Sequence, residues 1–290
     1  MVRGITPRQP SRSGRHEGAK PQQPRRAESR GISRAPKKQA PSPAPKAATA
    51  KTAAAKGAAG KPAIGYNPVA PARVQELLKR LGKAYPDATC ALHHSSAWEL
   101  LVATILSAQC TDVRVNMVTP ELFRKYPTPQ AFAAIAPEDL EADIRSTGFF
   151  RNKAKSVVGA ARKVVGDFGG EVPADMERLL QLPGVARKTA NVVLGTWFGK
   201  ADGVVVDTHV HRISRRLELT EEDDPAKIER DLMKVIPRDH WILFSHEIIL
   251  HGRARCVARQ PKCADCPLED HCHAADKTWS TVALHKSAKL

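Results

Sequence analysis

The spacing of apolar residues after residue 70 is that of helices almost everywhere. Val74, Leu77, Leu78 and Leu81 follow the i, i+3, i+4, i+7 pattern of one helix face, on a segment that begins at Pro71. Alternation of apolar and polar residues, which marks a half-buried strand, is hardly visible. The pattern therefore predicts an all-α fold.

Capping residues set the expected ends of several helices. Ser96 and Glu99 have capping-box spacing, and Asp112 is a candidate cap for the next helix. The pair Gly169-Gly170 is suited to end a longer helix, with apolar face Ala154, Val157, Val158, Ala161, Val165 and Phe168, in a left-handed cap. The expected helices are 71–85, one after Ser96, 112–123, short ones after Thr128 and Pro137, 154–168, 176–182, 187–198, 207–217, 225–236 and 240–251.

Charge is concentrated at the start of the chain. The 290 residues include 46 Lys and Arg against 30 Asp and Glu, a formal charge of +16, and residues 1–66 alone contribute +13. Those residues contain nine prolines but no Leu, Phe, Trp or Cys. They have too little apolar surface to offset the entropy of ordering, so we expect a disordered basic tail. Its charge favours a polyanionic partner and should add salt-sensitive affinity for nucleic acid.

The sequence lacks the usual signals of a membrane or secreted protein. No run approaches eighteen uninterrupted apolar residues, and no apolar segment follows the first charges. We therefore expect an intracellular protein without a membrane partner, in the cytoplasm and nucleoid if it is bacterial. The Arg-rich, acid-poor start leaves an organelle or nuclear address open.

A tight turn joins two of the expected helices at Leu182-Pro183-Gly184-Val185-Ala186, and the next helix opens with Arg187-Lys188-Thr189-Ala190-Asn191. The unpaired N–H groups at that helix N-terminus and the helix dipole suit a phosphate. A lone Pro-Gly turn is usually a plain connection between helices, but the whole string is far less common.

Three further strings accompany this hairpin: Leu106-Ser107-Ala108-Gln109, Thr147-Gly148-Phe149-Phe150 and Val206-Asp207-Thr208-His209. Together the four resemble the glutamine loop, wedge loop, hairpin and catalytic aspartate segment of the endonuclease III family of DNA glycosylases. The resemblance covers roughly residues 70–275 and excludes the tail. It implies a helix-hairpin-helix fold and base excision repair of DNA.

The resemblance implies that Lys188 is the nucleophile and Asp207 the catalytic carboxylate of a bifunctional glycosylase and abasic-site lyase. A lysine in the first turn of a helix, beside Arg187, should lose its proton more easily than a free one, and its amine can form a Schiff base with the sugar. That step displaces the damaged base, and β-elimination then cleaves the strand 3′ of the abasic site. Oxidised pyrimidines such as thymine glycol are the implied substrates, within damaged double-stranded DNA.

Extrusion of the damaged nucleotide leaves a hole that side chains must fill. The resemblance assigns Gln109 to the orphaned base and Phe149 to the wedge, although an aromatic residue after glycine is about as often ordinary core or a loop anchor. We expect the remaining DNA contacts of these segments from Gly184, Val185, Ala186, Arg187 and His209.

One position departs from the family pattern, because Ala186 stands where the hairpin usually has a second glycine. If φ is positive there, alanine adds strain of roughly 1 kcal/mol, and its methyl group crowds the phosphate. We therefore expect weaker DNA binding than a glycine would give.

Four cysteines near the C-terminus read C-x6-C-x2-C-x5-C, namely Cys256, Cys263, Cys266 and Cys272. Four thiolates in a compact loop suit either tetrahedral zinc, with neighbouring histidines as substitutes, or one four-iron, four-sulfur cluster. Resemblance favours the 4Fe-4S cluster, because endonuclease III-like glycosylases use this spacing. The basic residues in and beside the loop are expected to contact DNA phosphates: Arg253, Arg255, Arg259 and Lys262.

The expected organisation has three parts: a disordered tail (1–66), a helical barrel domain with the hairpin (89–200), and an iron-sulfur domain formed by 67–88 with 201–290. Lys188 and Asp207 fall on opposite sides of the domain boundary, so we expect the active site between the domains of a monomer. Two alternatives remain open. An adenine glycosylase would typically lack Lys188, and a non-enzymatic DNA-binding module would leave Lys188 and Asp207 unexplained.

Overall fold

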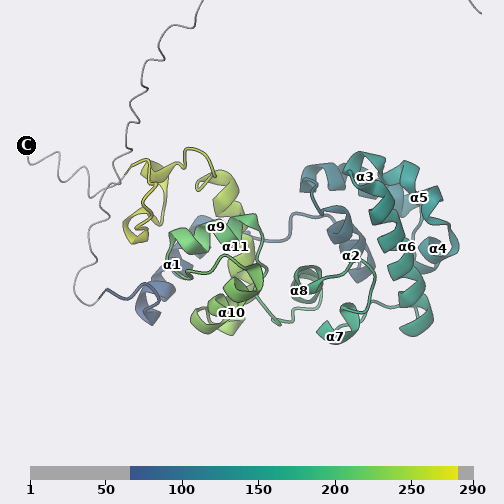
Figure 1. Cartoon of the computed structure of the whole chain (residues 1–290), viewed down its shortest axis with the longest axis horizontal. Helices are drawn as coiled ribbons and strands as arrows, with labels where there is room; N and C mark the ends of the chain where they lie inside the picture. The colour runs from purple at the N-terminus through teal and green to yellow at the C-terminus, as the bar shows by residue number, and fades with distance from the viewer. Residues whose placement is uncertain (1–65, 280–290) are drawn as a thin grey trace, which may run out of the picture. The chain divides into compact units, whose positions relative to one another are not determined.

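The regular elements in the part of the chain that the computed structural model describes, residues 66–279, are all helices, and this part contains no β-strand (Figure 1). Its α-helices are α1 Pro71–Ala84, α2 Ala97–Leu106, α3 Asp112–Lys125, α4 Pro129–Ala134, α5 Pro137–Ile144, α6 Phe150–Asp167, α7 Met176–Leu179, α8 Arg187–Thr196, α9 Thr208–Arg216, α10 Pro225–Val235 and α11 Trp241–Ala254. Short 3-10 turns are η1 Arg145–Thr147, η2 Arg238–His240, η3 Cys263–Asp265 and η4 Glu269–His271. The expected all-α fold is confirmed, while residues 1–65 of the predicted tail lie outside the described residues.

Side-chain caps start several helices close to where the sequence places them. Ser96 caps α2 by accepting from the Glu99 amide at 3.1 Å, but the Glu99 carboxylate accepts from the amide of Ser95, at 2.6 Å. The cap of α3 is Thr111, whose hydroxyl accepts from the Arg114 amide. The expectation that Asp112 is this cap is therefore wrong by one residue, and Asp112 instead becomes the first residue of the helix.

The long helix α6 ends at two left-handed glycines, as expected. Gly169 and Gly170 have φ of +65° and +89°, and the Gly170 amide donates back to the Val164 carbonyl at 2.9 Å. Of the predicted apolar face, Ala154, Val157, Val158 and Ala161 are fully buried, whereas Val165 is only half-buried and Val164 is fully buried in addition.

Buried apolar residues form two clusters. The first lies among α2 to α8, where α6 packs against both α4 and α5, and α2 packs against α8. Cys90 and Cys110 are half-buried against this cluster, so both are ordinary apolar packing partners. The second cluster joins α1 to α9, α10 and α11 and is continued by the cysteine segment (Figure 1).

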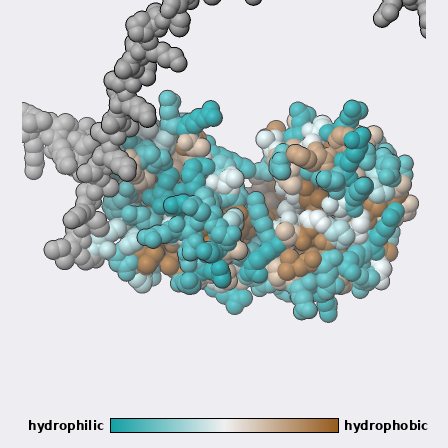
Figure 2. Space-filling model, viewed as in Figure 1, coloured by the Kyte–Doolittle hydropathy of each residue, from teal (hydrophilic) through white to brown (hydrophobic). Residues whose placement is uncertain are grey.

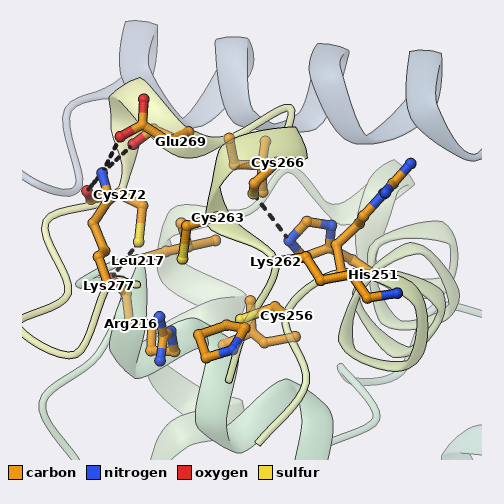
Figure 3. A pocket seen from close by; sticks show the side chains of 14 residues that line it. Arg216, Leu217, His251, Cys256, Lys262, Cys263, Cys266, Glu269, Cys272 and Lys277 are labelled. Carbon is orange, nitrogen blue, oxygen red and sulfur yellow. Dashed lines mark hydrogen bonds and ion pairs between the residues drawn. The ribbon is translucent and has the colours of Figure 1, made fainter. Parts of the chain in front are cut away.

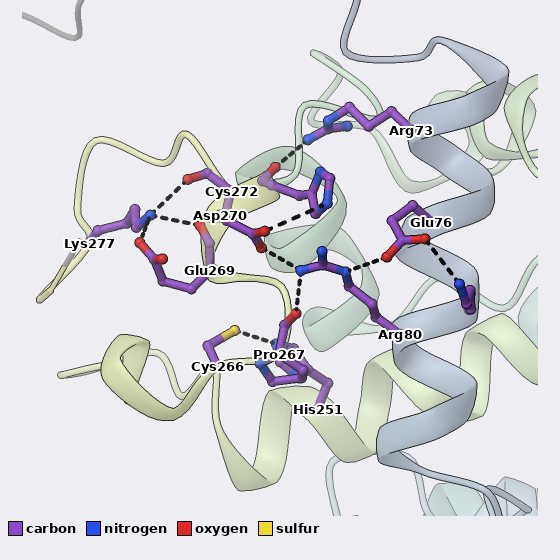
Figure 4. Close-up of polar contacts among 12 residues, drawn as sticks. Arg73, Glu76, Arg80, His251, Cys266, Pro267, Glu269, Asp270, Cys272 and Lys277 are labelled. Atoms are coloured by element: carbon purple, nitrogen blue, oxygen red, sulfur yellow. Dashed lines mark hydrogen bonds and ion pairs between the residues drawn. The ribbon is translucent and has the colours of Figure 1, made fainter. Parts of the chain in front are cut away.

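Arginines on α1 hold that helix against the cysteine segment. Arg80 donates to the Pro267 carbonyl at 3.1 Å and contacts the Asp270 carboxylate at 2.5 Å, while Arg73 donates to the carbonyl of His271 (Figure 4). Arg73 also donates to the carbonyl of Leu217, just after α9. These guanidinium groups satisfy carbonyls that the irregular segment leaves without helical partners. They connect the beginning of the described chain to its end.

The visible surface is mainly hydrophilic, with hydrophobic residues in separate patches (Figure 2). Three of the most exposed large apolar side chains are Val113, Met117 and Phe149, at 72, 66 and 62 % of their full exposure. No helix within residues 66–279 is both long and apolar enough to cross a bilayer.

Candidate active site and DNA-facing residues

One cleft contains both residues that the sequence assigns to the chemistry. Lys188 and Asp207 line it, together with Ser107, Ser245 and His246, and it encloses about 870 Å³ including the open solvent at its mouth. Lys188 comes from α8, a helix of the first cluster, whereas Asp207 directly precedes α9 of the second. The two side chains therefore meet at a concave site with walls from both clusters.

The turn between α7 and α8 presents Lys188 to this cleft. Gly184 has φ of +76°, and a Cβ at this position would lie 2.5 Å from the Cβ of Ser156 on α6, so the turn needs glycine. Val185 is buried behind the turn. Lys188 is exposed in the first helical turn, and its amine has no ion pair with any described residue.

The backbone at Ala186 corrects one expectation. Ala186 is the N-cap of α8 with φ of −97° and ψ of 171°, which is ordinary extended backbone. The strain of roughly 1 kcal/mol that a positive φ would add is therefore absent at Ala186. The left-handed residue of this turn is Gly184, so only the methyl group of Ala186 remains as an argument for weaker phosphate binding.

Asp207 is held as the N-cap of α9. Its Oδ1 accepts from the amides of His209 and Val210, both at 2.8 Å. These amides and the helix dipole stabilise a negative charge on the carboxylate. The carboxylate is thus fixed in direction at the wall of the cleft without a side-chain cation directly bound to it among the described residues.

Two residues assigned to DNA contact are engaged within the protein. The Arg187 Nε donates to both carboxylate oxygens of Glu229 on α10, at 3.0 and 2.9 Å, and this hydrogen bonding raises the pKa of Arg187. The His209 ring lies against Gly252, where a Cβ would meet its Nδ1 at 2.5 Å, and burial lowers the pKa of His209. Both side chains tie helices together beside the cleft, a role that their sequence context did not signal.

The predicted plug and wedge residues come together with the hairpin. Gln109, Phe149 and Gly184 line one surface hollow that also includes Ser156. Gln109 and Phe149 are exposed, and both are non-glycine residues in the left-handed region, with φ of +53° and +49°. An exposed aromatic ring is not core, which removes that interpretation of Phe149 and leaves the wedge and the loop anchor.

Buried polar residues around these loops were missed from the sequence. Lys153 on α6, Asn191 on α8 and Glu229 on α10 are 5, 4 and 7 % exposed. The signal available was positional, because each lies on the apolar face of its helix. Asn191 donates to the Oε1 of Glu229 at 2.8 Å, which links the helix of the predicted nucleophile to α10.

The four C-terminal cysteines line a single cavity of about 380 Å³, including the solvent at its opening (Figure 3). All four are free thiols, and Cys256, Cys266 and Cys272 pack against the second apolar cluster. His251 stands at the same cavity, with its Nε2 3.6 Å from the Cys266 sulfur and its Nδ1 3.0 Å from the Tyr85 hydroxyl.

The donor set of four cysteine sulfurs around one cavity fits a four-iron, four-sulfur cluster, which four cysteine thiolates hold. Burial raises the pKa of Cys266 to about 11, so this thiol needs a bound metal to be a thiolate at neutral pH.

The basic residues of the loop divide into paired and unpaired groups. Arg253 contacts Asp112 at the start of α3, with N and O 2.5 Å apart, and Arg255 lies 3.6 Å from the Asp265 carboxylate. Arg259 and Lys262 are exposed and have no ion pair with a described residue. Arg259 and Lys262 are thus the members of this group whose charge is fully available to a phosphate.

Comparisons with known proteins place this architecture in a family. Residues 102–238 match the HhH-GPD superfamily of base excision DNA repair proteins, and residues 256–272 match the iron-sulfur binding domain of endonuclease III. Endonuclease III of Synechocystis sp. is 59% identical over 203 residues, which are 70% of this chain and 93% of that protein. The chain belongs to the endonuclease III family. Endonuclease III of Bacillus subtilis is 44% identical over 206 residues, 71% of this chain and 94% of that protein.

Solved structures of endonuclease III have the same fold. A non-covalent endonuclease III–DNA complex is 44% identical with a TM-score of 0.68, and covers 71% of this chain and 96% of its own. A trapped endonuclease III–DNA covalent intermediate is 43% identical with the same TM-score, and covers 71% of this chain and 97% of its own. Membership in the endonuclease III family makes the chain a DNA-binding glycosylase of base excision repair with an iron-sulfur centre. The zinc and non-enzymatic alternatives are therefore set aside, while its compartment stays a prediction.

Proposed function

We propose that the chain is a bifunctional DNA glycosylase and abasic-site lyase that removes oxidised pyrimidines from double-stranded DNA through a Schiff base on Lys188. The observation that supports it most is the cleft that Lys188 and Asp207 share. An amine and a fixed carboxylate facing one cavity provide the nucleophile and the counter-charge that the reaction needs.

The chemistry starts with attack of the Lys188 Nζ lone pair on the sugar C1′. The bond from C1′ to the base breaks, and the base leaves with that electron pair and gains a proton. The nitrogen then loses a proton and its lone pair forms a C1′=N bond as the C1′–O4′ bond breaks, O4′ gains a proton, and the opened sugar is bound to Lys188 as a protonated imine. The imine acidifies C2′, whose proton is removed. The electrons form a C2′–C3′ double bond as the C3′–O bond breaks, which releases the 3′ phosphate, and water then hydrolyses the imine to free Lys188.

Asp207 is proposed to stabilise positive charge on the sugar as the base leaves and to move protons in the steps that follow. Its carboxylate direction is set by the amides of His209 and Val210. Gln109 and Phe149 are proposed to occupy the space left by the extruded nucleotide, because both are exposed at one hollow beside the hairpin. Gly184, Val185 and Ala186 would hold the phosphate backbone at the N-terminus of α8.

Cys256, Cys263, Cys266 and Cys272 are proposed to hold one 4Fe-4S cluster. When bound, the cluster cross-links the loop through four metal–thiolate bonds and so fixes its backbone. Arg259 and Lys262, which are exposed there, would then be directed at DNA phosphates. We expect the protein to act as a monomer.

Borohydride trapping tests the lysine. With a thymine-glycol duplex and borohydride, we expect a covalent protein–DNA adduct for the wild type and none for Lys188→Ala, because only an imine is reduced to a stable amine. Lys234→Ala, which removes an exposed lysine of α10 that lies outside the cleft, should trap like the wild type. Binding of the duplex without any wild-type adduct would contradict the Schiff-base mechanism and point to a monofunctional glycosylase or another lesion.

A further inference from the structure

Lys153 is a buried lysine whose ammonium group connects the backbone segments that precede two loops. It lies in the first turns of α6 and is 5 % exposed. Its Nζ donates to the carbonyl of Leu106 and to the carbonyl of Thr147, both at 2.8 Å. Leu106 ends α2 and Thr147 ends η1, so one side chain connects segments that are about forty residues apart in sequence.

Each accepting carbonyl stands just before one of the exposed loop residues. Gln109 follows Leu106 by three residues, and Phe149 follows Thr147 by two. Both Gln109 and Phe149 have positive φ, a conformation that costs a non-glycine residue on the order of 1 kcal/mol and persists only where surrounding contacts enforce it. The Lys153 hydrogen bonds are contacts of that kind, because they fix the backbone immediately upstream of both residues.

The hydrogen-bond acceptors of the Lys153 amine are both carbonyl oxygens. Among the described residues it has no carboxylate partner, and burial is the main cause that lowers its pKa. The carbonyl groups at the C-terminal ends of α2 and η1 carry partial negative charge and have no N–H partner within their own helix. The buried Lys153 ammonium is therefore their hydrogen-bond donor. Replacing the amine with a methyl group would therefore leave two buried carbonyls without a partner.

We propose that Lys153 is a positioning residue that holds the Gln109 loop and the Phe149 loop at the separation needed to enter DNA together. The inference rests on the proposed function, since that function gives the two loops their task. Lys153 acts through the backbone of both loops and has no contact with the reacting atoms. Lys153, Gln109 and Phe149 line one surface hollow, so a single lysine lies beside both loops.

The test compares Lys153→Met with the wild type on two abasic substrates, one in duplex and one in single-stranded DNA. Only the duplex needs loops that enter the stack, so we expect cleavage of the duplex to slow by about 30-fold and cleavage of the single strand to change by less than about twofold. Gln109→Ala should show the same selectivity. In the double variant the duplex loss should be smaller than the product of the two single losses, because both substitutions disable one arrangement.

The matched control is Lys163→Met, which removes a partly exposed lysine of the same helix that pairs with Asp167. It should cleave both substrates at the wild-type rate. Amide hydrogen exchange gives a second readout that is independent of activity. In Lys153→Met, exchange at residues 107–111 and 147–150 should be faster than in the wild type and in Lys163→Met.

Equal slowing on both substrates, or unchanged exchange in the two loops, would overturn the positioning role. If Lys153→Met does not fold, Lys153→Gln is measured in the same way. It keeps an N–H donor on a side chain one bond shorter and without the charge, so we expect a smaller loss with the same selectivity for the duplex, and equal slowing on both substrates would overturn the positioning role. A wild-type protein that cleaves neither substrate would contradict the proposed function and would leave the positioning role to the exchange measurement. The exchange comparison would then still decide whether Lys153 orders the two loops.

Discussion

Asp207 holds the first turn of α9 with the same carboxylate that the proposed chemistry needs. One oxygen accepts two amide hydrogen bonds at 2.8 Å, so the orientation of the group is part of the helix itself. Removing the side chain would therefore unsettle the helix and the chemistry together. A substitution that keeps the cap while removing the charge separates the two.

Asp207→Asn is that substitution, because an asparagine side-chain oxygen caps helices as well as an aspartate does. We expect its melting temperature to stay close to that of the wild type and its rate of base release to fall by about 100-fold or more. The matched control is Asp224→Asn, which changes the cap of α10, where the aspartate accepts from the Lys227 amide at 3.0 Å. A comparable loss of rate in Asp224→Asn would show that cap chemistry, not catalytic charge, accounts for the effect.

Residue identities and local motifs were predictable, but backbone angles were not. The strings around Lys188 and Asp207 identified both residues, because a motif is a property of sequence. The left-handed residue of the turn is Gly184, which packs against Ser156 of α6, and no local pattern reports that contact. Lys153 was missed for a similar reason, since its two acceptors are carbonyls of distant segments.

Among the helices, α8 is anchored to α10 by a small polar network. Arg187 and Asn191 lie one turn apart on α8 and both donate to the Glu229 carboxylate. Gly203 has to be glycine here, because a Cβ would lie 2.0 Å from the Oε1 of Glu229. The network thus fixes the first turn of α8, which carries Lys188, relative to a helix of the other apolar cluster.

Glu229→Gln should weaken this anchor. The loss of charge leaves the Arg187 guanidinium without its partner, and we expect the free energy of unfolding to fall by about 2 kcal/mol, less than for a fully buried pair because Arg187 is half-exposed. Glu222→Gln breaks only a surface pair with Lys227 and should change it by less than about 0.5 kcal/mol. Urea unfolding of both variants measures the difference, and equal stability of the two would contradict the anchoring role.

Helix positions followed from the sequence better than helix contacts. Every expected helix is present, although α7 ends at Leu179 instead of 182, because the chain turns early to reach the hairpin. Periodicity locates the apolar face of a helix but not the helix that covers it. The pairing of α8 with α10 through Glu229 therefore could not be predicted.

Across the whole molecule, the cysteine segment is held by α1, and the proposed cluster would hold it a second time. We expect the purified protein to be brown and to contain about four irons per chain, as a 4Fe-4S cluster requires. Cys263→Ser should lose the colour and the iron, because Cys263 is the buried cysteine of the four. Cys90→Ser, which changes a half-buried cysteine far from that cavity in sequence, should retain both. A colourless wild-type protein with one zinc would contradict the cluster.

The division into a tail and two domains remains a prediction in its stated boundaries. The association of α1 with the C-terminal segment was anticipated only through the family resemblance, because helical periodicity alone does not say which distant helix a segment meets. The structure supplies the physical reason for it: α1 buries Val74, Leu77, Leu78 and Leu81 in the second cluster, and Arg73 and Arg80 bind carbonyls of residues beyond 210.

The contact between α1 and the cysteine segment has a consequence for biosynthesis. Arg80 and Asp270 are 190 residues apart, so the ribosome releases α1 long before its partner exists. The apolar face of α1 must remain without its native cover while the helices of the first cluster, whose contacts are encoded between residues 92 and 194, can already collapse. The segment that carries the cysteines emerges after those helices. Completion of the α1 core and assembly of the proposed cluster would therefore wait for the same late stretch of chain, and iron supply in the cell would then limit how much of the newly made protein matures.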